Sequence, residues 1–149
     1  MMIICSSDLV ANSESVTFEY ANSGIKHSDD NDADKQVEFL MKLSGQLRKG
    51  FDNQQLKIQH IAKSIAISER QLYRHSKSYL NDTPVGYLRR YRLQKALVKM
   101  REGEALGNIS YEVGFSSHSY FSRCFKQTFG NSPSVFVEQL KQFNEESFK

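Results

Sequence analysis

The chain has 149 residues, of which 39% are apolar and 25% are charged, so it can form one globular domain or two very small ones. This size argues against an enzyme built on a large domain. The charge is uneven, because residues 1–34 hold seven acidic side chains against one lysine, whereas the rest holds 19 Lys or Arg against 10 Asp or Glu. A basic globular part indicates a polyanionic partner.

Several classes of site lack their sequence signals. Cys5 and Cys124 lie far apart, and neither has a second cysteine or a histidine at ligand spacing, so we expect no disulfide, no metal and no cofactor. No Gly-rich phosphate loop, HExxH motif or paired-carboxylate motif suggests an enzyme. The opening "MMII" is too short for a signal-peptide core and no run approaches a membrane span, which predicts a cytoplasmic protein without a membrane partner.

Residues 1–34 are predicted to be an acidic, disordered tail or interdomain linker. They mix Ser, Asn and Asp with scattered apolar residues, and such a segment cannot bury enough surface to offset its ordering entropy. A short strand at "SVTFEY" is the alternative, but it would need a partner sheet that the chain does not provide.

Helical spacing starts at Lys35 and predicts a first unit over about residues 35–82. One helix face is expected to hold Val37, Leu40, Met41 and Leu47, and Gly50 stands at the position of a helix C-terminus. A short second helix carries Leu56, Ile58, Ile61, Ala62 and Ile65. Ser68 is then placed to cap a third helix, with Leu72 and Tyr79 facing inward. A short helix, a three-residue break and another helix are typical of a helix-turn-helix.

A long linker helix is predicted over about residues 84–101, followed by a second unit over about 105–145. Thr83 is its expected cap, Pro84 its first residue and Gly103 its end. The stretch "NISYEVGF" predicts another short helix, residues 114–130 the next one, and Pro133 starts a last helix through Phe136, Leu140 and Phe143.

The second unit repeats the first with an offset of 49 residues. Ser68 corresponds to Ser117, and Pro84 corresponds to Pro133. The other matching pairs are Leu72 with Phe121, Arg74 with Arg123, Lys77 with Lys126, Asn81 with Gly130, Thr83 with Ser132 and Tyr87 with Phe136. Each unit therefore has a Ser-capped helix with an apolar anchor and two basic residues on one face. A helix that enters a major groove needs this chemistry: short polar residues, an Arg that pairs with guanine, and basic side chains further out that contact phosphates.

The stretches "YEVGFSSHSYFSRCFKQTFGNSP" and "RRYRLQKALVKM" resemble the DNA-binding domain of the AraC/XylS family of bacterial transcription regulators, and the resemblance covers roughly residues 38–143. It implies an all-α fold of about seven helices in two homeodomain-like helix-turn-helix subdomains. Residues 35–149 would form this domain. It further implies regulation of transcription, for instance activation, through two recognition helices in successive major grooves of promoter or operator DNA.

The resemblance also implies roles for individual residues. Base-reading positions are Arg70, Tyr73 and Arg74 in the first recognition helix, and His118, Ser119, Ser122 and Arg123 in the second. Phosphate-contacting positions are Ser68, Lys77, Ser117 and Lys126, together with Arg89, Arg90 and Arg92 on the linker helix, where some should face phosphates and others solvent.

The chain departs from the family pattern mainly in its first unit. Ala66 and Asn81 replace glycines, Ser76 stands where a large apolar residue is usual, and Glu69 adds a negative charge near phosphates; Gly107 is the departure in the second unit. Ser76 predicts poorer packing of the first unit. We expect Tyr120, Phe121, Phe125, Phe129 and Cys124 to belong to the core, and His60 and His75 to cap or pack.

A nonspecific basic architectural protein or an RNA-binding module is the alternative function, although such proteins usually show intercalating wedges or exposed aromatic platforms. Family members commonly join this domain to a sensor or receiver domain, so an upstream partner domain is possible, as are RNA polymerase contacts and a homodimer. The chain is then either a compact stand-alone regulator or the output end of a longer polypeptide, and the acidic segment favours the second.

Overall fold

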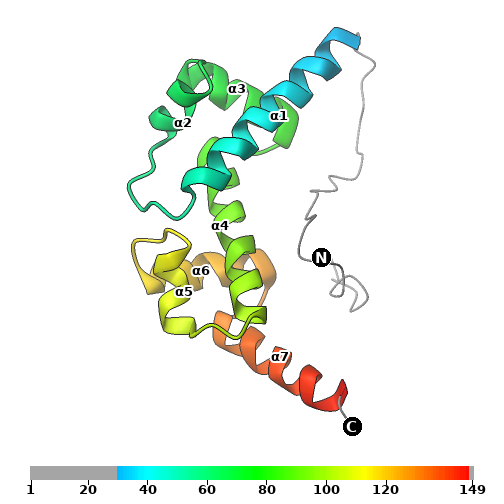
Figure 1. Ribbon diagram of the computed structural model, residues 1–149, viewed down its shortest axis with the longest axis vertical. Helices are drawn as coiled ribbons and strands as arrows, with labels where there is room; N and C mark the ends of the chain where they lie inside the picture. Colours follow the sequence, from blue (N-terminus) through cyan, green and yellow to red (C-terminus); the bar gives the residue numbers. More distant parts are fainter. Residues whose placement is uncertain (1–29, 148–149) are drawn as a thin grey trace.

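The computed structural model describes residues 30–147, and within them the chain forms seven α-helices and no strand (Figure 1). α4 runs through the middle of the molecule, with α1, α2 and α3 at one end and α5, α6 and α7 at the other. This confirms the all-α fold. None of the described helices is long and apolar enough to cross a membrane. The helices are α1 (Asp30–Gly50), α2 (Ile58–Ser64), α3 (Glu69–Leu80), α4 (Pro84–Arg101), α5 (Leu106–Glu112), α6 (His118–Phe129) and α7 (Pro133–Ser147).

α1 begins earlier than the sequence pattern indicated. It starts at Asp30, not at Lys35, so the last five residues of the predicted tail are helical. Asp32 lies in the first turn, where a negative side chain interacts favourably with the positive end of the helix dipole. The remainder of the predicted tail, residues 1–29, lies outside the described part of the chain.

The buried face of α1 also differs from the prediction. Phe39, Leu43 and Leu47, spaced four residues apart, are at most 7% exposed, whereas Val37 is 55% and Met41 is 69% exposed. Of the predicted inward residues, Leu47 is buried and Leu40 partly so. Apolar residues occur around much of this helix, so the contact with α2 and α3 decides which stripe faces the core.

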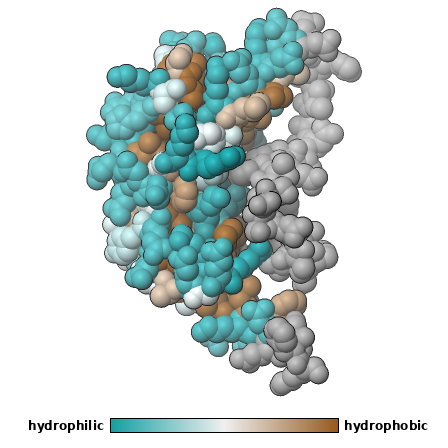
Figure 2. All heavy atoms as spheres, viewed as in Figure 1, coloured by the Kyte–Doolittle hydropathy of each residue, from teal (hydrophilic) through white to brown (hydrophobic). Residues whose placement is uncertain are grey.

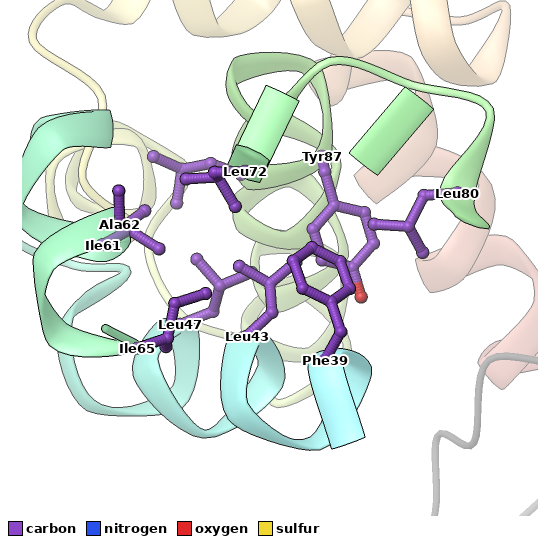
Figure 3. Packing of buried hydrophobic residues seen from close by; sticks show 10 residues of the cluster. Phe39, Leu43, Leu47, Ile61, Ala62, Ile65, Leu72, Leu80 and Tyr87 are labelled. Atoms are coloured by element: carbon purple, nitrogen blue, oxygen red, sulfur yellow. The ribbon is translucent and has the colours of Figure 1, made fainter. Parts of the chain in front are cut away.

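The first core lies between α1, α2, α3 and the start of α4. Figure 3 shows side chains from these helices pointing toward one another. The buried members are Phe39, Leu43, Leu47, Ile61, Ala62, Ile65, Leu72, Leu80, Tyr87 and Leu88. Ser76 is also fully buried in α3, and its hydroxyl has no hydrogen-bond partner among the described residues.

The second core is richer in aromatic residues. Phe125 lies at its centre, with ring centroids of Phe121 at 5.7 Å, Phe129 at 4.7 Å and Phe136 at 5.7 Å. This confirms the expected core role of Phe121 and Phe125, and Cys124 is packed there as well. The buried members are Leu93, Ala96, Met100, Ile109, Val113, Phe115, Phe121, Cys124 and Phe125.

The predicted repeat is visible in the ends of the two recognition helices. The hydroxyl of Ser68 accepts from the backbone N–H of Gln71 at 3.1 Å, and that of Ser117 accepts from the N–H of Tyr120 at 3.2 Å. Both helices end in a left-handed residue, Asn81 at φ 52° and Gly130 at φ 86°. The predicted caps are therefore confirmed in both units.

The turn before the recognition helix differs in length between the units. α3 and α6 are 49 residues apart in sequence, but α2 and α5 are only 48 apart, so the second turn contains one more residue. Each turn has one left-handed residue, Ala66 at φ 59° in the first and Gly114 at φ 87° in the second. Ala66 therefore occupies a conformation that glycine adopts at lower cost.

Candidate nucleic-acid interface

The outer face of α3 carries the residues predicted to read bases in the first unit. Arg70, Tyr73 and Arg74 are exposed, because Leu72, Ser76 and Leu80 occupy the buried face. Lys77 lies one turn further on and is exposed as well. The hydroxyl oxygen of Ser68 serves as the helix cap, which leaves its O–H able to donate to a phosphate.

The outer face of α6 carries the matching set in the second unit. His118, Ser119, Arg123 and Lys126 are exposed, and Ser122 is half-buried. The hydroxyl of Ser117 caps the helix as Ser68 does in α3. The structure thus gives both recognition helices a polar outer face that starts at a serine-capped helix N-terminus, where the remaining backbone N–H groups favour phosphate.

His118 connects α6 to α5. Its Nδ1 lies 3.4 Å from the hydroxyl of Ser110, which is buried, and its Nε2 lies 3.5 Å from the hydroxyl of Ser122 on the next turn. A neutral imidazole donates from one nitrogen and accepts at the other, so His118 can hold both hydroxyls at once. The side chain predicted to read a base also orients Ser122, its neighbour on the same helix face.

Tyr120 lies between two arginines from different helices. The guanidinium carbon of Arg123 is 5.4 Å from the centroid of the Tyr120 ring, and that ring packs on Phe115 at 5.8 Å. A hydrogen bond to the Tyr120 hydroxyl raises the pKa of Arg89, which belongs to α4. Tyr120 was predicted to be a core residue; it is half-buried and also supports two cationic side chains. Its position three residues before Arg123 was the signal available in the sequence.

Arg90 is paired with a carboxylate of the same chain. Its Nη2 forms an ion pair with Oδ2 of Asp82 at 3.0 Å, and both side chains are partly buried. The other oxygen of this carboxylate accepts from the backbone N–H of Thr83 at 2.7 Å. A Cβ on Gly86 would overlap the carboxylate, so the glycine makes room for this arrangement. We therefore withdraw Arg90 from the predicted phosphate contacts, because Asp82 already neutralises it.

Arg92 turns back onto the loop that follows α1. Its Nε donates to the backbone carbonyl of Phe51 at 2.7 Å, and its Nη2 donates to that of Asn53 at 2.9 Å. Partial burial lowers the pKa of Arg92. The prediction that Arg92 contacts phosphate is therefore not retained either. Of the three arginines predicted to contact phosphate from the linker helix, Arg89 is the one that remains exposed.

Hydrophilic residues cover most of the face visible in Figure 2, and apolar residues show only in small patches between them. Among the described residues, no group of three or more His, Cys, Asp or Glu side chains is placed to hold a metal ion. The clearest chemistry on the surface is therefore the pair of basic, polar helix faces on α3 and α6.

A model of a helix-turn-helix domain family matches residues 61–139, more than half of the chain, and includes both recognition helices. A solved transcriptional regulator from Chromobacterium violaceum, described as containing an AraC-type DNA-binding domain, superposes with a TM-score of 0.64 at 27% identity and covers 74% of this chain and 97% of its own. The chain belongs to the AraC-type helix-turn-helix family. This confirms the resemblance noted in the sequence.

Two further proteins are similar to this AraC-type domain. The uncharacterised HTH-type transcriptional regulator YdeC of Bacillus subtilis is 36% identical over 81 residues, which are 54% of this chain and 28% of that protein. The DNA-binding domain of AdpA, solved in complex with a target DNA, has the same fold with a TM-score of 0.64 at 17% identity, covering 70% of this chain and 94% of its own. The chain spans only 7% to 28% of the length of the first curated relatives that it matches.

Proposed function

We propose that the domain binds double-stranded DNA sequence-specifically, with α3 and α6 in successive major grooves, and thereby regulates transcription from a promoter or operator. DNA binding and transcription regulation are what the AraC-type fold supports, and relatives such as YdeC and RhaS are described as transcriptional regulators. The observation that carries the specific form of the proposal is the equivalence of the two recognition helices. Each has a serine cap, a buried apolar anchor and exposed basic residues at the same positions.

In this proposal each recognition helix uses one residue to recognise a base and another to contact the DNA backbone. Arg74 and Arg123 read guanine through O6 and N7, because a planar guanidinium can donate to both atoms at once. Lys77 and Lys126 lie further along each helix and contact phosphates as point charges. The neighbouring contributors to reading are Arg70, Tyr73, His118, Ser119 and Ser122, and the further phosphate contacts are Ser68, Ser117 and Arg89.

The biological setting follows from the same proposal. The structure of the AdpA domain with target DNA supports duplex DNA as the ligand. A regulator of bacterial type acts on promoter DNA in the cytoplasm, and contact with RNA polymerase is the step that would convert DNA binding into activation. The much greater length of the curated relatives supports a role as the output domain of a longer protein that carries a sensor or receiver.

Selection of bound sequences from random duplex DNA, followed by footprinting with the monomeric protein, tests the proposal. We expect an asymmetric site with two elements in tandem, about one helical turn (~10 bp) apart. A strictly palindromic site occupied only by dimers would contradict this reading. Salt-dependent binding without sequence preference would instead favour the nonspecific architectural or RNA-binding alternative.

A further inference from the structure

The two units meet at a small cluster beside α4, which we call the junction: Phe51, Asn53, Arg92 and Gly114. Phe51 and Asn53 belong to the loop between α1 and α2, which descends beside α4 toward the second unit in Figure 1. Arg92 of α4 binds the carbonyls of Phe51 and Asn53 at 2.7 Å and 2.9 Å. Gly114 lies in the turn that leads into α6.

Gly114 shows how closely the parts of the junction approach. It is left-handed, with φ at 87°, and a Cβ at this position would overlap the carbonyl oxygen of Phe51 and lie 2.9 Å from Nε of Arg92. The turn of the second unit therefore contacts the loop of the first through main-chain atoms and Arg92. Phe51 also packs against both hydrophobic cores and meets the ring of Tyr91 at 5.5 Å.

The hydrogen bonds of Arg92 resist loosening of this contact. A desolvated guanidinium must be paired, and hydrogen bonds from a charged donor are stronger than neutral ones. Without Arg92, the carbonyls of Phe51 and Asn53 would lose their charged donor, and only the packing of Phe51 and the close approach of Gly114 would brace the junction beside α4. A single helix can bend and twist more freely than a helix braced on one side.

We propose that Arg92 is a positioning residue that fixes the relative orientation of α3 and α6, and so makes the domain selective for the spacing between its two DNA elements. The inference rests on the proposed function, in which both helices enter the DNA. One inserted base pair moves the second element by about 3.4 Å and turns it by roughly a tenth of a helical turn. A braced domain cannot follow this displacement, whereas a loosened one can.

The test compares duplexes that carry the selected site with its native spacing, one base pair fewer or one more, and a fourth duplex with the second element scrambled. The full chain and its Arg92→Met, Arg92→Lys and Arg101→Met variants are titrated on all four. Arg92→Met keeps the length of the side chain without donors, and Arg92→Lys keeps the charge with a single donor group. Arg101→Met is the matched control, because Arg101 is an exposed arginine of the same helix that lies away from the junction.

We expect the unaltered chain to prefer the native spacing about tenfold or more, since misplaced helices lose base contacts. Arg92→Met should reduce that preference to about threefold or less, with Arg92→Lys in between, because each loses bracing hydrogen bonds. Arg101→Met should leave the preference for native spacing unchanged. Thermal melting and circular dichroism establish which variants are folded at the temperature of titration. If Arg92→Met is not folded, the comparison is made with Arg92→Lys.

Two results separate the inference from the proposed function. If the unaltered chain binds the duplex with the scrambled element as tightly as the native site, the two-helix function is wrong and the inference falls with it. If both elements are needed, but a folded Arg92 variant keeps the full preference for native spacing, the inference alone is overturned.

Discussion

The two helix-turn-helix units offer similar surfaces over cores of different chemistry. At equivalent places, the first unit has Ser76 and Asn81 and the second has Phe125 and Gly130. Phe125 anchors an aromatic cluster within the second unit. In the first unit, Phe39 of α1 fills part of this role through ring contacts with His75 at 5.3 Å and Tyr79 at 5.7 Å.

The difference shows that the recognition face and the core of such a unit are set by different residues. The serine caps, the left-handed C-caps and the exposed basic positions are the same in both units, although the buried neighbours are not. The first unit carries two local costs: a left-handed alanine at position 66 and an unpaired buried hydroxyl at Ser76. We therefore expect the first unit to be the less stable of the two.

The largest effect should come from emptying the aromatic centre of the second unit. Phe125→Ala removes a fully buried ring, and we expect it to lower the free energy of unfolding by about 3 to 5 kcal/mol. Urea denaturation followed by circular dichroism measures this. Lys126→Ala, one residue away and exposed, is the control. An equal effect of both variants would contradict the assignment of Phe125 to the centre of the core.

The next largest effects concern the equivalent arginines of the two surfaces. Arg74→Ala and Arg123→Ala should each cost about 1 to 3 kcal/mol on the selected site and relax discrimination at one base pair, because each loses a two-point contact with guanine. The two relaxed positions should lie about one helical turn (~10 bp) apart. Titration on duplexes with single base changes measures this.

Lys77→Ala and Lys126→Ala are the matched controls for the arginines. Each should weaken selected and scrambled duplexes alike and make the slope of log affinity against log salt shallower by roughly one unit. If Arg123→Ala weakens both duplexes by the same factor, Arg123 belongs with the phosphate contacts and not with the base readers.

A smaller effect, of opposite sign, is expected at the buried serine of the first unit. Ser76→Ala removes a hydroxyl that has no partner, and we expect it to raise the free energy of unfolding by about 1 kcal/mol. Denaturation in urea again provides the measurement. A destabilised Ser76→Ala variant would mean that the hydroxyl is satisfied and that the first core is better packed than described above.

The smallest effect is a pH dependence specific to the first unit. Burial and the charge of Arg74 lower the pKa of His75 below its ordinary value of 6.5. Above that value the imidazole is neutral in both states, but below it the unfolded chain binds a proton that the folded chain resists, so stability falls as pH decreases. The second unit has Cys124 at the equivalent position. The fall in melting temperature below about pH 6.5 should be smaller in His75→Gln, and an unchanged pH profile would refute the role of His75.

Local chemistry was the part of the fold that the sequence made predictable. Helix starts depend on interactions within a few residues, as at Ser68, Thr83, Ser117 and the two prolines. The sequence repeat likewise predicted that Arg74 and Arg123 lie on exposed faces, as they do. The predicted core aromatic residues Phe121 and Phe125 are likewise buried.

What the sequence could not predict depends on contacts between distant segments. The buried stripe of α1 is chosen by α2 and α3, so Val37 and Met41 face outward despite their apolar character. The partner of Arg92 is a loop about forty residues away in sequence, which no periodicity indicates. The ion pair of Arg90 with Asp82, in the turn before α4, was likewise not predicted, because the two residues are eight positions apart and no local pattern joins them.

α4 belongs to both units at once. Tyr87 and Leu88 near its start complete the first core, and Leu93, Ala96 and Met100 further along begin the second. If either unit unfolded alone, half of this helix would expose apolar side chains, and it would lose neighbours that hold the other half in place. The overlap therefore links the two units in one cooperative unfolding transition. Local unfolding of one unit also lowers the stability of the other.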